Sequence, residues 1–331
     1  MNRRVLYPAG MIWIILICLA LAALGAGLDF TFPGTITRLY ARPVDFGIAF
    51  PSPNVWNFLP GWGEAINIIA LGVCALSFYL LNKQFGLTRT GQPIGAAFLL
   101  PLTYANFAIS SHLTAAPLVM MFCIMIFAAL LNSYRKRNAT HAMFFVATCL
   151  SVGSMMEYAM IPFILASLLG AFFLGAMRIK EFLALGIGLI APYWVAIGLG
   201  IVNPLEMHLP HPQTIFSTIP DMPTFLLLAL VTILTLGGIF LSLYNGLILY
   251  AGNTRVHRSV LTINAFGIIA MLSMWLDLNN IEAYLGVFYL WIALQLANLF
   301  TLRELQRSVL TFWFLQLAIM STSLLFILHR F

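Results

Sequence analysis

Residues 224–250 read TFLLLALVTILTLGGIFLSLYNGLILY, a stretch that contains no charged side chain. A helix needs about 20 apolar residues to cross the hydrocarbon core of a bilayer, and this stretch exceeds that length. The whole chain has the same character, because 62% of its 331 residues are hydrophobic and only 8% are charged. A soluble domain carries roughly 25% charged residues, so the sequence predicts an integral membrane protein.

Ten further apolar segments flank this stretch on both sides. With it they predict an all-α, polytopic transmembrane bundle of about 11 spans, folded as a single membrane domain over residues 1–331. The expected segments are 7–28, 65–82, 93–110, 113–134, 141–156, 159–177, 181–202, 224–250, 259–276, 283–301 and 308–328.

Thirteen of the 16 lysines and arginines fall on one side of this alternating topology. If the N-terminus is cytoplasmic and the C-terminus outside, only Arg38, Arg42 and Arg330 lie outside. Retention of basic residues on the cytoplasmic side explains that bias, and it also explains the net charge of +6 without a nucleic-acid partner. Eight of the ten acidic residues are predicted to lie outside. Acidic residues contribute little to orientation, so this excess points to a role for the outer face.

The predicted outer loop 29–64 combines many aromatic residues with five prolines and both signs of charge. Such a loop is expected to lie along the membrane surface as short interfacial pieces. One interpretation is a site for a lipid-linked substrate, in which Asp29 or Asp45 acts as a base and Arg38 and Arg42 bind a phosphate, with Glu64 nearby. The other interpretation is an aromatic belt with ordinary ion pairs.

The second outer loop, 203–223, contains Glu206, His208 and His211. A carboxylate and two histidines are potential metal ligands, but Pro210 and Pro212 prevent a helix from fixing their geometry. We therefore expect an interfacial loop and no metal. The four cysteines lie within apolar segments and lack ligand spacing, and no nucleotide-binding glycine pattern occurs, so no cofactor is expected.

Glu157 is the acidic residue expected to lie deepest, among methionines between segments 141–156 and 159–177. An ionisable residue below the headgroups is a candidate for a functional site. Its alternatives are a side chain that reaches the interface or one that meets His112 of a neighbouring hairpin.

Two resemblances accompany these patterns. The stretches Ser77-Phe-Tyr-Leu-Leu-Asn-Lys83, Phe85-Gly-Leu87 and Leu131-Asn-Ser-Tyr-Arg135 resemble an uncharacterised family of bacterial multi-pass inner-membrane proteins. That family implies location in the bacterial inner membrane and no particular activity. The order of spans and outer loops is similar to that of membrane glycosyltransferases that use polyprenyl-phosphate sugars, whose catalytic base lies in the first outer loop. In this chain, Asp29 or Asp45 would be the counterpart.

Three functions remain open from the sequence. The first is a non-catalytic subunit or scaffold of a cell-envelope complex, with membrane lipids and other inner-membrane proteins as partners. The second is an outward-facing glycosyltransferase that uses a polyprenyl-phosphate-linked substrate. The third is a transporter or flippase, which the scarcity of charges within the spans disfavours.

Overall fold

In the computed structural model, the described residues are 8–31, 46–56, 61–88, 93–136, 138–208, 212, 214, 222–248, 252–300 and 309–328. Their regular structure is helical, apart from one isolated bridge between Phe46 and Pro51. The α-helices are α1 (Pro8–Thr31), α2 (Trp62–Phe85), α3 (Ile94–Tyr104), α4 (Phe107–Ser110), α5 (Ala116–Asn132), α6 (Thr140–Met156), α7 (Pro162–Phe173), α8 (Ile179–Gly198), α9 (Met222–Ile248), α10 (Thr254–Leu276), α11 (Ile281–Leu299) and α12 (Val309–Leu328). Short 3₁₀ helices are η2 (Pro53–Val55), η3 (Tyr158–Met160), η4 (Pro204–Glu206) and η5 (Leu278–Asn280).

Six stretches of helix within the described residues are long and apolar enough to cross a membrane. They are Gly10–Gly27, Trp62–Phe85, Ile179–Gly198, Thr224–Tyr244, Thr254–Leu276 and Leu278–Leu299. Five shorter apolar helices accompany them. The prediction of an all-α membrane bundle is therefore confirmed, whereas the count of about 11 spans and the orientation of the ends stay predictions.

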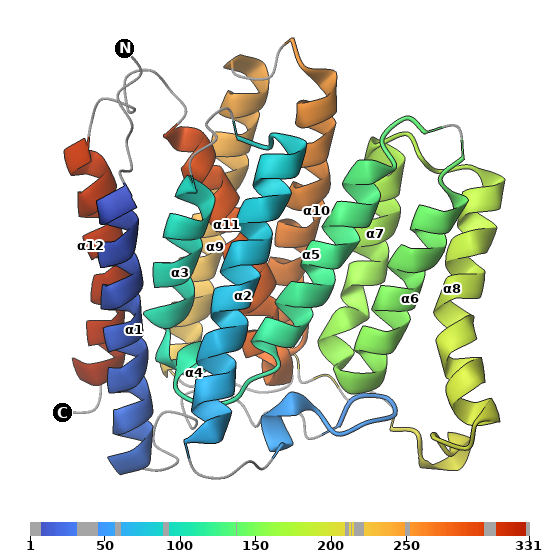
Figure 1. Cartoon of the computed structure of the whole chain (residues 1–331), viewed down its shortest axis with the longest axis horizontal. Helices are drawn as coiled ribbons and strands as arrows, with labels where there is room; N and C mark the ends of the chain where they lie inside the picture. The colour runs from blue at the N-terminus through green and yellow to red at the C-terminus, as the bar shows by residue number, and fades with distance from the viewer. Residues whose placement is uncertain are drawn as a thin grey trace.

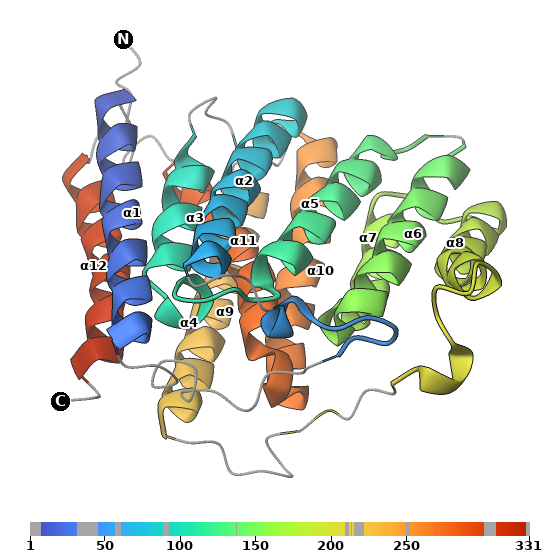
Figure 2. The same cartoon turned by 60° about the horizontal axis from the view of Figure 1, so that its bottom comes forward.

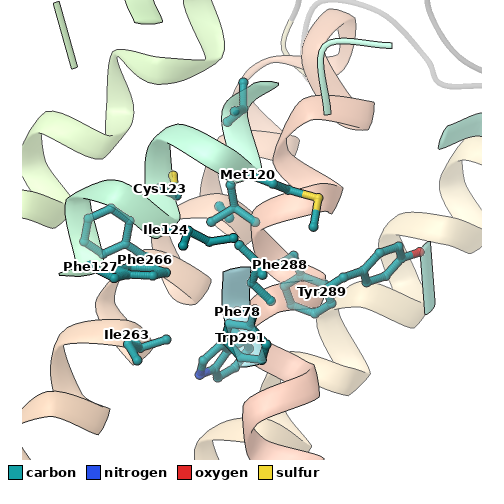
Figure 3. Close-up of a cluster of buried hydrophobic side chains, with 14 of the residues drawn as sticks. Phe78, Met120, Cys123, Ile124, Phe127, Ile263, Phe266, Phe288, Tyr289 and Trp291 are labelled. Carbon is teal, nitrogen blue, oxygen red and sulfur yellow. The ribbon is translucent and has the colours of Figure 1, made fainter. Parts of the chain in front are cut away.

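The long helices run alternately up and down and form one bundle (Figure 1). α11 lies at its centre, since 89% of the Leu278–Leu299 stretch is buried, against 28% for the stretch in α8. Figure 3 shows part of the core, where Phe78, Phe127, Phe266, Phe288 and Trp291 come together from α2, α5, α10 and α11. Dispersion contacts and close packing between such side chains hold helices together in a membrane, where burial from water is already complete.

Several predicted boundaries are wrong, for local reasons. Loop 29–64 is shorter at both ends, because α1 continues to Thr31 and α2 begins at Trp62. The segment 93–110 is not one helix, since Asn106 has extended backbone between α3 and α4 and its side chain caps α4 by accepting the backbone N–H of Ala108. The segment 159–177 starts with η3 and becomes α-helical at Pro162, a residue that favours the first turn of a helix.

Candidate acid–base site at one end of the bundle

Two hairpins of the bundle turn in the same way, and each turn carries an acidic residue. After α6, Glu157 adopts extended backbone with φ −150°, and η3 then leads into α7. After α10, Asp277 adopts φ −146°, and η5 leads into α11. In both turns the acid's backbone N–H donates to the carbonyl four residues earlier, that of Gly153 or Ser273, at 2.8 Å. The chain therefore repeats a helix–acid–3₁₀–helix unit, and α7 of one unit packs on α10 of the other.

Glu157 is fully buried at the turn of the first hairpin. The Ser52 hydroxyl donates a hydrogen bond of 2.6 Å to its Oε2. No described lysine or arginine lies within ion-pair distance of this carboxyl. Burial raises its pKa to about 7, and the nearby Asp277 carboxyl adds to that rise. Hydrogen bonds from the Ser52 hydroxyl and from the backbone at Ala159 and Tyr158 oppose it. Near neutral pH the group is therefore a mixture of acid and carboxylate.

The segment 46–56, which we call the lid, covers this carboxyl. Its backbone N–H groups at Ile48, Ala49 and Phe50 donate to the carbonyls of Ser154 and Met155 at 2.9–3.2 Å. Gly47 lies so close to the backbone of Met156 that an added Cβ would overlap it. The lid, blue in Figure 2, lies across the lower ends of α5 and α7. Backbone hydrogen bonds and a close approach at glycine thus hold Ser52 over Glu157.

The loop that follows α8 closes over the same place. The Tyr158 hydroxyl donates to the His208 carbonyl at 2.7 Å, and the His208 N–H donates to the Ile48 carbonyl at 3.1 Å. The His208 ring packs at 4.8 Å from the ring of Phe46. His208 therefore joins the loop after α8 to the lid through its backbone, and its side chain is exposed.

The second hairpin brings two more carboxyls to this end. The Asn280 side chain donates to Asp277 Oδ2 at 2.6 Å, and the Tyr284 hydroxyl donates to the same oxygen at 3.2 Å. Burial raises the pKa of Asp277, and these hydrogen bonds oppose the rise. Glu282 follows in the first turn of α11, where its Oε2 lies 3.8 Å from Nε2 of His112.

His112 lies in the turn between α4 and α5. Burial lowers its pKa to about 4, so the ring is neutral at pH 7 and its contact with Glu282 is not a charged pair. Nearby, the Asn54 side chain of the lid accepts the backbone N–H of Ala115 at 2.8 Å. The lid is thereby tied to the turn that carries His112 as well as to the turn that carries Glu157.

The structure brings only some of the predicted site residues together. Glu157, His112 and His208 lie at one end of the bundle, and His112 contacts Glu282. Asp29 lies in the last turn of α1, at the opposite edge of the bundle from α6 (Figures 1 and 2). Glu64 is half-buried in the first turn of α2, and so belongs to a helix and not to the loop. Arg38, Arg42, Asp45 and His211 lie outside the described residues, and Glu206 ends η4.

No group of three or more histidine, cysteine or acidic side chains is placed to bind a metal ion within the described parts of the chain. The four cysteines are buried and free, as expected for packing residues. Ser52, Asp277 and Glu282 were not predicted as site residues. A signal for Asp277 existed, since it stands, like Glu157, directly after an apolar segment and shortly before the next one.

No family model, curated protein or solved structure matches the chain. The function is therefore interpreted from the geometry of the site alone, and the two resemblances stay expectations.

The arrangement is suited to proton transfer. The pKa of one buried carboxyl is raised to about 7, the Asp277 carboxyl lies near it, and two loops cover it. Glu282 contacts a neutral imidazole at the same end of the bundle. A general base works best when its pKa is close to the working pH, which is the condition that burial creates for Glu157.

Proposed function

We propose that this chain is an outward-facing membrane enzyme that transfers a glycosyl group from a polyprenyl-phosphate-linked donor, with Glu157 as the acid–base residue. The observation that carries the proposal is the buried Glu157 carboxyl, whose pKa is raised to about 7 beneath the Ser52 hydroxyl of the lid. This residue replaces Asp29 and Asp45 as the proposed base. Location in the bacterial inner membrane, with the site facing outward, belongs to the same proposal.

In the proposed reaction, Glu157 takes the proton from an acceptor hydroxyl as its oxygen attacks the anomeric carbon of the donor. The bond from that carbon to the phosphate oxygen breaks, and the lipid phosphate leaves with the electron pair. Arg38 and Arg42, which precede the lid in the sequence, would hold the negative charge of the phosphate. The lid supports this assignment because it brings the same loop to Glu157.

The test compares two buried acids in cells that lack the chromosomal gene. Glu157→Gln keeps the size of the side chain and an oxygen that accepts from Ser52, but removes the base. Glu181→Gln is the matched control, because Glu181 is also buried and lies at the start of α8, at the other end of the bundle. We expect the first variant to lose an envelope glycan and the second to retain it, at equal protein abundance by immunoblot. Full complementation by Glu157→Gln contradicts the proposal.

A second candidate function is a subunit of a membrane complex, and the exposed face of α8 favours it. α8 packs mainly on α6, with Gly188 against the backbone of Phe144. At Gly186 and Gly198 of the same helix, an added Cβ would meet no atom of a neighbouring element within 4 Å. Small residues on an open helix face allow a second helix to approach closely.

This candidate predicts a protein partner along α8. Gly186→Leu should reduce co-purification of that partner in mild detergent, while Glu157→Gln should leave it unchanged. Recovery of a solitary monomer under the same conditions would count against a complex, without bearing on the enzyme.

A further inference from the structure

A lengthwise groove lies on the side of the bundle, between α7, α9 and α10. Its volume is about 680 Å³, and its lining extends along α10 from Thr254 to Leu272. Leu165 and Leu243, on its opposite walls, are more than half exposed, so the groove opens toward the surrounding lipid. Its length along α10 equals most of the span of that helix.

Most of the wall of this groove is apolar. Of its polar lining residues, Thr254 and His257 lie at one end, and Ser242 and Asn264 bond to each other. The Asn264 amide donates to the Ser242 hydroxyl, and its oxygen accepts from Trp291 Nε1 and Gln295 Nε2, both at 2.8 Å. The Asn264 side chain therefore forms its hydrogen bonds with residues of the bundle and not with a ligand in the groove. A polar ligand would find little to bind along the groove, whereas a hydrocarbon chain would be accommodated.

One end of the groove is basic. Thr254, which lines that end, lies 3.3 Å from the Tyr134 hydroxyl, and the guanidinium groups of Arg135 and Arg255 both lie over the Tyr134 ring, at 5.5 and 6.0 Å from its centre. Arg258 follows one turn along α10, beside Gly175. No described carboxylate lies within ion-pair distance of these three arginines.

We infer that this groove binds one anionic phospholipid, with an acyl chain between α7, α9 and α10 and the phosphate at Arg255 and Arg258. Charge complementarity selects the occupant: the groove is apolar along its length and positively charged only at its end, which matches a lipid with a negative headgroup. The site lies at the end of the bundle away from Glu157, on the face that the basic residues predict to be cytoplasmic. It does not depend on the proposed enzymatic activity.

The experiment measures lipid retention by native mass spectrometry. The purified full chain is equilibrated in detergent with equal amounts of phosphatidylglycerol and phosphatidylcholine that carry the same acyl chains. We expect one phosphatidylglycerol to be retained in preference. The double variant Arg255→Gln/Arg258→Gln should reduce that preference by on the order of tenfold, or about 1.4 kcal/mol. Ile268→Trp, which fills the groove, should abolish retention of either lipid.

Two control variants make the result specific. Lys83→Gln removes an exposed basic residue at the same end of the bundle, on α2, and Leu183→Trp adds an indole to an exposed position of α8 outside the groove. Both should retain the lipid like the wild type. Equal retention of the two lipids by the wild type, unchanged retention by both groove variants, or a co-purified protein helix in place of lipid would each overturn the inference. Each variant is scored only if it elutes as a single peak in gel filtration.

Discussion

The Glu157 carboxyl is buried, and its raised pKa links the stability of the fold to pH. Its pKa in the folded chain is about 7, above the ordinary value of 4.5. The folded state therefore binds the proton more tightly than the unfolded state, and its stability falls as the pH rises through that interval. Burial of one acid thus makes the stability of the whole bundle sensitive to pH near neutrality.

This shift predicts a difference between the wild type and Glu157→Gln. The free energy of unfolding in detergent should fall by about 3 kcal/mol more in the wild type as the pH rises from 4.5 to 7. His112, whose pKa is lowered to about 4, lowers the stability of both proteins alike at pH values below its ordinary pKa of 6.5, so it does not contribute to the difference between the curves. Parallel curves would show that Glu157 is accessible to water.

Gly47 gives a second prediction at the scale of a residue. Because a Cβ there would overlap the backbone of Met156, Gly47→Ala should push the lid away from the turn of the first hairpin. Overpacking of this kind costs about 1–3 kcal/mol. We expect faster hydrogen exchange at Ile48, Ala49 and Phe50 with little change at α2. Unchanged exchange in the lid would mean that the chain accommodates the methyl group elsewhere.

At this scale the sequence predicted part of the site. A single acid between two apolar segments pointed to Glu157, because an ionisable residue there must be buried or functional. The Ser52 hydroxyl escaped prediction, since its 105-residue separation from Glu157 is bridged only by the path of the lid. Glu282 was not predicted as a site residue, because the sequence placed it in a polar turn. It lies instead in the first turn of a central helix.

The elements of the bundle meet through glycines, and the contact between α10 and α11 is the tightest of these. At Gly267 of α10 an added Cβ would overlap the indole of Trp291, a fully buried side chain of α11. Figure 3 shows Trp291 in the cluster of core side chains that joins these helices. A glycine is needed here for helix approach, although it lowers the propensity of the helix itself.

Gly267→Ala should therefore lower the free energy of unfolding by about 1–3 kcal/mol. Gly237→Ala in α9 is the matched control, since its Cβ would meet no atom within 4 Å, and alanine is the better helix former. Thermal unfolding in detergent should place the first variant below the wild type and the second at or slightly above it. Equal melting temperatures for the two variants would contradict this account of the contact.

The repeated hairpin turn shows why element boundaries were only partly predictable. Hydropathy located the helices because each must be apolar over its length. It did not show that the two turns are alike, since around Glu157 and Asp277 the sequences MMEYAMI and WLDLNNI share few residues. The two turns share a backbone conformation but few side chains, so the repeated helix–acid–3₁₀–helix unit cannot be recognised from the sequence.

For the whole molecule, the distribution of charge remains the main evidence on orientation. The predicted sidedness places the lid and the acid cluster outside, and the arginines of α10 in the cytoplasm. Helices that alternate in direction separate the two ends of the bundle (Figure 1), which makes that sidedness open to measurement.

The side of the membrane on which each end lies can be measured with single cysteines, introduced into a chain without Cys18, Cys74, Cys123 and Cys149. Leu205→Cys, at an exposed position of η4, should react with a membrane-impermeant maleimide in intact cells. Thr254→Cys, at the exposed start of α10, should react only after the membrane is permeabilised. The reverse pattern would place Glu157 in the cytosol and exclude a substrate that arrives from outside.

Backbone N–H groups of the lid bond to the first hairpin, and this affects which positions of the lid can change during evolution. Exchanging Ile48, Ala49 or Phe50 for other amino acids leaves the amide protons that make the attachment in place, provided that proline is avoided. Over many generations these three positions can diverge, while Gly47 and Glu157 stay under selection. Related proteins would then share the glycine of the lid and the acid of the first hairpin, while the rest of the lid differs in sequence.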